Sequence, residues 1–375
     1  MDPRSLPQEV GFLNHVPDFK LIEDVAKGYA GYKNILIIGH GGSVTSFYGY
    51  YSALNSQAVK QVYFLSTTDP DYIYKLKLSL PEKETLVIVI SKSGENITVF
   101  EALSQFSGYN ILCITGTNSS LRAYVEKLGG KIINHPPIGG RFSGLTEVAL
   151  LPAMIAGLDA EGIYDGAAQL YAQFGKDNPA WHAASVFWQL EQQGYTDVFM
   201  PFYSHSLFPM SALIVQLCHE SFGKSGRGQT YFAHEGPESQ HHTNQRFFGG
   251  PKNICGCFVT TDSFVHDTMI TYPNPVHEVW IKSGQLKNMD QIRLADSMHF
   301  EADGTMEDAR IAGIPFAHVE INGFNAQEIG PFTAFWQLFA VYSSVLRGVD
   351  PFNQPQVENS KIISFDKRLK SKGLL

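Results

Sequence analysis

The chain has 375 residues, more than one hydrophobic core usually supports, so its length predicts two domains. Apolar residues make up 44% of it and charged residues 17%, a composition that excludes an intrinsically disordered protein. The formal net charge of −8 argues against nucleic acid or an anionic membrane as a partner, because both attract a basic surface.

The cysteines and the N-terminal residues indicate the compartment. Only four cysteines occur, and Cys255 and Cys257 are too close together in a strand-like stretch for a secreted disulfide framework. The first 15 residues lack the apolar stretch of a signal peptide, and no apolar run reaches the length of a membrane span. We therefore expect a soluble, cytoplasmic protein.

The first half of the chain alternates short β-branched runs with segments of helical periodicity. Four of these runs predict buried strands of a parallel sheet: residues 34–39, 62–65, 85–92 and 110–115. The segments between them, such as residues 98–106, supply the helical crossovers that parallel strands require. The first half is therefore expected to form a doubly wound α/β domain.

The second half repeats this pattern. The alternation breaks near residues 157–175 and restarts with a helix over 180–193 and a strand over 197–203. The later elements expected in this half are strands over residues 253–260, 278–281 and 316–321 and an apolar helix over 329–346. The second half is therefore expected to form a second α/β domain.

These patterns together predict an α/β fold with two doubly wound parallel sheets, each in a three-layer αβα sandwich. We expect the first domain to cover residues 1–165 and the second 166–348. A C-terminal helical arm over residues 349–375 is expected to follow them.

Two glycine- and serine-rich loops follow predicted strands of the first half. Residues 39–43 (GHGGS) place glycines where the backbone must turn sharply and can approach an anion. Residues 91–96 (SKSGEN) bring hydroxyls and helix-start amides to the same edge of the sheet, where open α/β sheets bind ligands. A dinucleotide loop for the first and helix capping for the second are the alternatives. The two loops together favour a phosphate site.

This pair of loops, about 50 residues apart, resembles the sugar isomerase (SIS) domain, in which such loops hold the phosphate of a phosphosugar. Further motifs, described below, resemble the glucose-6-phosphate isomerase family specifically. They occur in the family's order between about residues 34 and 361. Asn96 stands where the family usually has a threonine. The resemblance implies SIS-type domains and a substrate site in these loops that includes Gly42, Ser43, Ser91, Lys92, Ser93 and Asn96.

The segment 216–224 (QLCHESFGK) ends an apolar, helix-like run at a small-residue turn. Glu220 would lie at the C-terminal end of that helix, where the helix dipole favours a raised carboxylate pKa and hence a general base. From spacing alone, an exposed glutamate in a last helical turn is the simpler explanation. The segment resembles the family's Glu-Ser-Asn-Gly-Lys signature except at Phe222. This implies that Glu220 is the catalytic base and that Gln216 contacts the substrate.

An arginine follows two glycines in the segment 139–143 (GGRFS), after a strand-like run. Arg141 keeps its charge when buried, which suits a group that stabilises an enediolate. A surface salt bridge is the alternative. The resemblance implies the first role, because the family's corresponding arginine performs it.

Residues 235–245 (EGPESQHHTNQ) are rich in titratable and amide groups. The resemblance aligns Gln240 and His241 with a family motif whose histidine moves the ring hydroxyl proton, a role suited to a neutral imidazole. The neighbouring residues depart from the motif, so His242 stays an alternative. A metal site in this segment is a further alternative, but no zinc-ligand spacing supports it, and we expect no metal and no cofactor. In the family this histidine reaches the neighbouring subunit's active site, which implies a homodimer with shared sites.

Residues 352–361 (FNQPQVENSK) resemble the family's Phe-Asp-Gln-Trp-Gly-Val-Glu-Leu-Gly-Lys. The spacing between Gln354 and Lys361 is preserved. The resemblance implies that Lys361 assists ring opening and that Gln354 contacts the phosphate. Without it, a solvated lysine in a basic tail would be the simpler interpretation of Lys361.

The implied activity is the reversible isomerisation of glucose 6-phosphate and fructose 6-phosphate through ring opening and a cis-enediol(ate). Two alternatives remain at this stage. The enzyme could also accept mannose 6-phosphate, or the chain could be a non-catalytic phosphosugar-binding regulator that needs the two loops but no base. The resemblance assigns no role to His40, for which packing or capping is the simplest interpretation.

Overall fold

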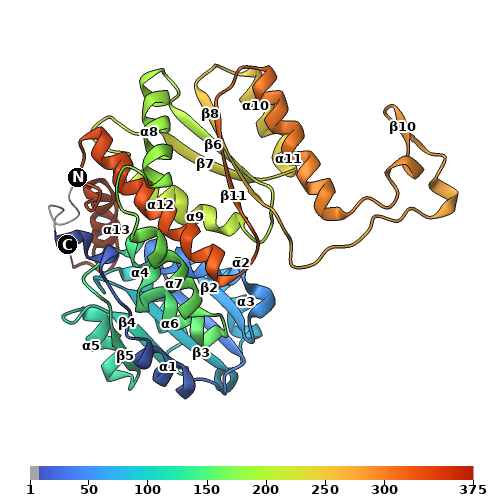
Figure 1. The fold of residues 1–375 in the computed structure, drawn as a ribbon. Coiled ribbons are helices and arrows are strands. Elements are labelled where there is room, and N and C mark those ends of the chain that lie inside the picture. Colours follow the sequence, from blue (N-terminus) through green and yellow to red (C-terminus); the bar gives the residue numbers. More distant parts are fainter. Residues whose placement is uncertain (1–7, 375) are drawn as a thin grey trace.

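The structure is a computed structural model that describes residues 8–374. Figure 1 shows two sheets with helices packed around and between them. The first sheet has the order β2-β1-β3-β4-β5, and all its pairings are parallel. Its strands are β1 (Asn34–Gly39), β2 (Gln61–Leu65), β3 (Thr85–Ser91), β4 (Asn110–Thr115) and β5 (Lys131–Asn134).

Both faces of the first sheet are covered, because its central strands are apolar at successive positions rather than at alternate ones. In β1, Ile35 and Ile37 enter one core, whereas Leu36 and Ile38 enter a second core on the opposite face. The second core is closed by α3 (Pro70–Ser79), α4 (Ile97–Ser104) and α5 (Ser120–Lys127). The first core is closed by α1 (Phe19–Gly28), α2 (Gly42–Ala53) and α6 (Glu147–Ala156).

The second sheet has the order β11-β8-β6-β7 and is also entirely parallel. Its strands are β6 (Asp197–Phe202), β7 (Thr230–Glu235), β8 (Ile254–Thr261) and β11 (Phe316–Ile321). One face packs on α8 (Pro179–Gln192), α9 (Ser211–Phe222) and α12 (Ala326–Arg347), and the other on α10 (Thr243–Gly249) and α11 (Leu294–Ile311). The predicted α/β class with two parallel sheets is confirmed.

Helix α12 joins the two halves. It packs on α7 (Ala160–Tyr171) as well as on α8 and α9, so one continuous core extends over both sheets. The approach to α7 is close enough that a Cβ on Gly330 would lie 1.9 Å from the carbonyl oxygen of Ile163. By length and composition α12 could cross a membrane, but 78% of its apolar stretch is buried inside the protein. It is therefore a core helix.

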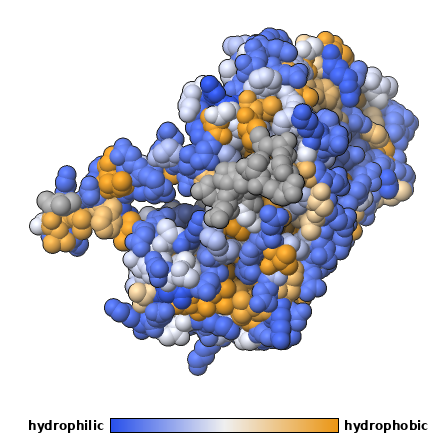
Figure 2. Space-filling view, turned by 60° about the vertical axis from the view of Figure 1, so that its left-hand side comes forward, coloured by the Kyte–Doolittle hydropathy of each residue, from blue (hydrophilic) through white to orange (hydrophobic). Residues whose placement is uncertain are grey.

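Residues 262–293, which we call the protruding segment, leave the body between β8 and α11 (Figure 1). The predicted strand over 278–281 belongs here and not to the second sheet, so that expectation was wrong. Instead, β9 (Trp280–Ile281) pairs antiparallel with β10 (Gly284–Gln285) in a two-stranded ribbon. The run is too short for its apolar character to identify its pairing partner. The same projection stands clear of the body in Figure 2.

The C-terminal residues return to the first half of the chain. Helix α13 (Glu358–Ser371) forms the predicted helical arm, and Arg368 pairs through two nitrogens with the carboxylate of Glu101 in α4, at 2.6 and 2.8 Å. The remaining short elements are 3-10 turns: η2 (Gln8–Leu13), η3 (Asn55–Gln57), η4 (Glu82–Glu84), η5 (Gly140–Leu145), η6 (Phe208–Met210), η7 (Glu238–His241), η8 (Asn274–Val276), η9 (Leu286–Met289) and η10 (Pro355–Val357).

Candidate active site

The two phosphate-loop candidates lie side by side at the carboxyl edge of the first sheet. Strands β1 and β3 are neighbours there, with β2 on the other side of β1, so the strand order reverses between them. Ligands of open α/β sheets bind at such a switch point. In the first loop Gly41 has a φ of +56°, a conformation that favours glycine, and α2 begins directly after it with Gly42 and Ser43 in its first turn.

The second loop uses its hydroxyls as acceptors. The Ser91 hydroxyl accepts from the amide of Gly94 at 3.1 Å, and the Ser93 hydroxyl accepts from the amide of Glu95 at 3.4 Å. Each hydroxyl thus keeps its own proton available for an anion. Asn96 is the N-cap of α4, and the ammonium of Lys92 donates to the carbonyl of Pro137 at 3.2 Å.

The first loop presses against the segment that carries Arg141. A Cβ on Gly42 would lie 2.1 Å from the amide nitrogen of Arg141 and 2.3 Å from the carbonyl carbon of Gly140. Only glycine permits this approach of two backbones. The η5 turn that begins at Gly140 therefore places the arginine beside the phosphate loops.

Arg141 is 3% exposed and lies at the centre of a hydrogen-bond cluster. Its guanidinium donates to Glu220 Oε2 at 3.0 Å, to Gln354 Oε1 at 2.9 Å, to Ser221 Oγ at 3.0 Å and to the carbonyl of Pro351 at 2.6 Å. Burial lowers the pKa of Arg141 and the Glu220 carboxylate opposes that shift. The alternative of a surface salt bridge is wrong, because the arginine is buried.

Glu220 stands in the last turn of α9, as the sequence predicts. Its side chain is 24% exposed, and its second oxygen, Oε1, accepts from Gln216 Nε2 at 3.0 Å. Gln216 lies one turn earlier on the same helix and accepts in turn from the hydroxyl of Thr45 at 3.3 Å. The carboxylate is thus held between a guanidinium and an amide, with access to solvent.

Lys224 was not singled out in the sequence, although it ends the motif that contains Glu220. Its ammonium donates to the carbonyls of Asp350 and Asn353, each at 2.6 Å, and to Asn353 Oδ1 at 3.0 Å. Burial, followed by the charge of Arg141, lowers the pKa of Lys224. Together with Arg141, this lysine holds the C-terminal segment that carries Gln354 over the cluster.

Lys361 is 54% exposed and pairs with Glu358 Oε1 at 2.8 Å on its own helix. The pKa of His40, in the first phosphate loop, is lowered mainly by burial. The positive charge of Lys361 is the second cause of that shift. Phe222, the departure from the family signature, is fully buried and packs under the guanidinium of Arg347 at 4.6 Å. This departure from the family signature therefore places a side chain in the hydrophobic core.

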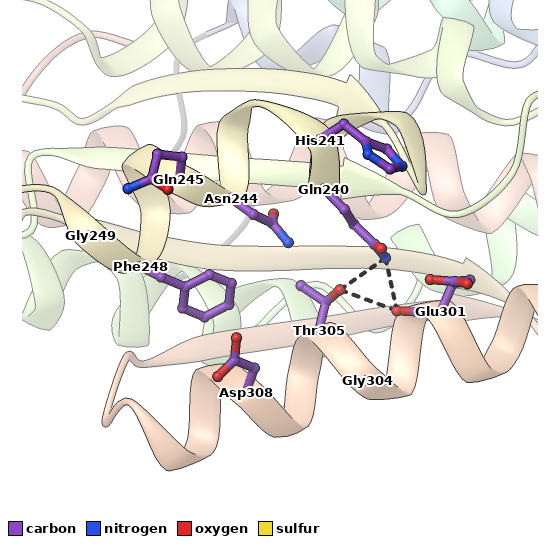
Figure 3. Close-up of a pocket in the computed structure, with 10 residues that line it drawn as sticks. All are labelled: Gln240, His241, Asn244, Gln245, Phe248, Gly249, Glu301, Gly304, Thr305 and Asp308. Atoms are coloured by element: carbon purple, nitrogen blue, oxygen red, sulfur yellow. Dashed lines mark hydrogen bonds between the residues drawn. The ribbon is translucent and has the colours of Figure 1, made fainter. Parts of the chain in front are cut away.

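The structure does not bring His241 to this cluster within the chain. It lines a cleft of about 710 Å³ between α11 and the η7–α10 segment (Figure 3). There Gln240 donates to the hydroxyl of Thr305 at 3.0 Å and to the carbonyl of Glu301 at 3.1 Å. His242 contacts the hydroxyl of Thr243 at 2.7 Å. No group of three or more metal-ligating side chains is formed among residues 8–374, so the alternative metal site in this segment is not formed there.

No family model matches this chain. Relatives are nevertheless found along most of its length. A probable glucose-6-phosphate isomerase of Haloquadratum walsbyi is 29% identical, covering 92% of this chain and 81% of that protein. A probable glucose-6-phosphate isomerase of Methanococcus maripaludis is 27% identical over 97% of this chain and 85% of that protein.

Solved structures share the fold. A hypothetical protein of Thermus thermophilus superposes with a TM-score of 0.86 at 24% identity, covering 98% of this chain and 91% of that one. A glucose-6-phosphate isomerase of Chlamydia trachomatis superposes with a TM-score of 0.78 at 19% identity, covering 94% and 73%. The chain is therefore a homologue of proteins named glucose-6-phosphate isomerase and shares the parallel-sheet α/β fold of these solved structures.

Proposed function

We propose that this protein interconverts glucose 6-phosphate and fructose 6-phosphate through ring opening and a cis-enediol(ate). The observation that carries the proposal is the carboxylate of Glu220, held at 3.0 Å from both Arg141 and Gln216. Proton transfer between C1 and C2 needs a base in reach of both carbons and a positive group near the developing enediolate oxygen. Glu220 would be that base and Arg141 that positive group.

The phosphate would bind at the switch point of the first sheet. We assign it to the hydroxyls of Ser43, Ser91 and Ser93, the ammonium of Lys92 and the amides that begin α2. The support is that both loops lie at one sheet edge, next to the turn that carries Arg141. Asn96 and Gln354 would complete the substrate contacts from α4 and the C-terminal segment.

Conversion of fructose 6-phosphate to glucose 6-phosphate, followed with a coupled glucose 6-phosphate assay, tests the activity. We expect turnover that persists in EDTA, because neither proposed step uses a metal. Parallel assays with mannose 6-phosphate separate a bifunctional isomerase from a specific one. Binding of fructose 6-phosphate without any turnover would instead favour a non-catalytic regulator and would overturn the proposal.

We further propose a homodimer in which His241 completes the partner's active site. Two observations support this. His241 lines a cleft that contains none of the residues of the Arg141 cluster. The protruding segment exposes large apolar side chains that a second copy would cover: Val265, Met269, Val279, Trp280 and Ile281.

Mixing two inactive variants tests the shared site. Glu220→Gln and His241→Ala, combined under conditions that exchange subunits, should recover activity, because each mixed dimer would contain one intact site. His242→Ala is the matched control and should stay active by itself. An absence of recovery after demonstrated exchange, or a fully active monomer, would place both residues on one chain.

Three further assignments accompany this proposal, on the domain boundaries, the cellular location and the partners. The domains would cover residues 1–165 and 166–348, with 349–375 as the arm; β5 ends at Asn134 and β6 begins at Asp197, on either side of the first boundary. A cytoplasmic location agrees with four cysteines that are all free and buried. Neither nucleic acid nor a membrane would be a partner, given the net charge of −8.

A further inference from the structure

His40 joins the two phosphate loops through a chain of hydrogen bonds. It lies in the first loop, directly after β1, and its Nε2 is 2.9 Å from the hydroxyl oxygen of Thr98 in the first turn of α4. That oxygen is in turn 2.7 Å from Oδ1 of Asn96, the N-cap of the same helix. The three side chains therefore connect two segments that are 58 residues apart in the chain.

The direction of each hydrogen bond follows from the groups themselves. Asn96 Oδ1 also accepts from the backbone amide of Thr98 at 3.2 Å, which identifies the atom that faces Thr98 as the oxygen. An amide oxygen only accepts, so the single hydroxyl proton of Thr98 is donated to it. The Thr98 oxygen must then accept from His40 Nε2–H.

This chain fixes which way the amide of Asn96 faces. Two donors, the backbone amide and the hydroxyl of Thr98, hold its oxygen toward the start of α4. The amide nitrogen lies on the other side of the group, and it makes no hydrogen bond to any of residues 8–374. Asn96 is only partly buried and follows Ser93 and Gly94 in the second loop. Its Nδ2 is therefore an available donor at the edge of the proposed phosphate site.

We propose that His40 is a positioning residue for phosphate binding: through Thr98 it holds the Asn96 amide so that Nδ2–H donates to an oxygen of the bound phosphate. This inference rests on the proposed function, in which the two loops bind the phosphate of the substrate. The three donors, His40 Nε2–H, Thr98 Oγ1–H and Asn96 Nδ2–H, would all donate toward the anion. Hydrogen bonds aligned in such a chain strengthen one another.

Binding of inorganic phosphate, measured by calorimetry, tests this chain without any turnover. His40→Leu removes the donor at Nε2, and we expect the dissociation constant for phosphate to rise about fivefold, as for the net loss of one hydrogen bond. His40→Gln should stay within about twofold of the unmodified protein, because its side-chain N–H lies near the Nε2 position. Thr98→Val removes the middle hydroxyl at nearly constant volume and should weaken phosphate binding as much as His40→Leu.

Double variants and a matched histidine complete this comparison. In an Asn96→Ala background, His40→Leu should change the dissociation constant by less than about twofold, because the effects of residues in one hydrogen-bond network are not additive. His318 makes the same kind of contact away from the two loops, with its Nε2 2.7 Å from the hydroxyl oxygen of Thr260. His318→Leu is the matched control and should leave phosphate binding unchanged. Equal losses in His40→Leu and His40→Gln, or a full effect of His40→Leu in the Asn96→Ala background, would overturn the proposal.

Kinetics with fructose 6-phosphate separate positioning of the phosphate from a role in proton transfer. His40→Leu should raise KM about fivefold and change kcat less than about twofold, because the phosphate is remote from C1 and C2. A collapse of kcat at unchanged KM would contradict the positioning role.

Nitrogen-15 NMR of labelled histidines tests the direction of the chain independently of activity. The His40 signals are assigned by their loss in His40→Leu, and at mildly alkaline pH we expect the Nε2–H tautomer. An Nδ1–H tautomer would overturn the inference, because Nε2 could then not donate to Thr98. The expected phosphate binding and spectra in a protein without isomerase activity would count against the proposed function alone.

Discussion

Glu220→Gln is expected to lower kcat for fructose 6-phosphate by about a hundredfold to ten-thousandfold, the usual cost of removing a general base. Glutamine keeps the shape of the side chain and can still accept from Arg141, so substrate binding and folding should survive. The measurements are steady-state kinetics and the thermal midpoint of unfolding. Glu126→Gln, on the exposed surface of α5, is the matched control and should leave kcat unchanged.

Solvent deuterium tests the same step in the unmodified protein. A carboxylate that exchanges its proton with water during the enediol lifetime places label at C2 of the glucose 6-phosphate formed in deuterium oxide. A hydride shift would carry no label. Turnover without any exchange, or a Glu220→Gln variant with most of its kcat, would show that the proposed proton transfer is wrong even if the substrate is right.

Arg141→Met is expected to affect both catalysis and stability. The substitution removes the cation beside Glu220, and loss of such electrostatic stabilisation costs about a hundredfold to a thousandfold in kcat. It also leaves the carbonyl of Pro351 and the amide oxygen of Gln354 without their donor. We expect a loss of about 3 kcal/mol in the free energy of unfolding, the lower end for a broken buried pair because Glu220 is partly exposed.

Arg141→Lys separates the two effects, because lysine keeps the positive charge but lacks the planar fork that donates to five partners. It should retain more stability than Arg141→Met and still lose most of its kcat. Urea unfolding and steady-state kinetics on the same preparations provide both values. A fully active Arg141→Met enzyme would contradict the role proposed for this arginine.

Local patterns determined much of the fold. Strands β1, β3 and β4 are continuous apolar runs, and such runs alternating with helical segments have few arrangements other than a parallel sheet covered on both faces. That arrangement places both phosphate loops at one edge, because the carboxyl ends of parallel strands share an edge. The last-turn position of Glu220 was likewise readable, since it depends only on where an apolar helix ends.

Other local expectations failed because neighbours far along the chain decide them. The run at 278–281 has the composition of a sheet strand, yet it lies in the protruding segment. Helix α7 lies in the stretch where the sequence pattern breaks, and α12 packs closely on it. A short apolar run does not specify its partner, and tertiary packing overrides weak local preference.

The roles of the charged groups depended most on the tertiary structure. The sequence, through its resemblance to the family, selected Glu220, Arg141 and Gln354 in three separate motifs. Only the folded chain shows that Arg141 donates to both of the others, and that Lys224 holds the same C-terminal segment. The contact of His40 with Thr98 could not be predicted either, because the first phosphate loop and α4 are 58 residues apart in the chain. Sequence periodicity records local backbone geometry, whereas a hydrogen bond between distant residues exists only once the sheet brings their loops together.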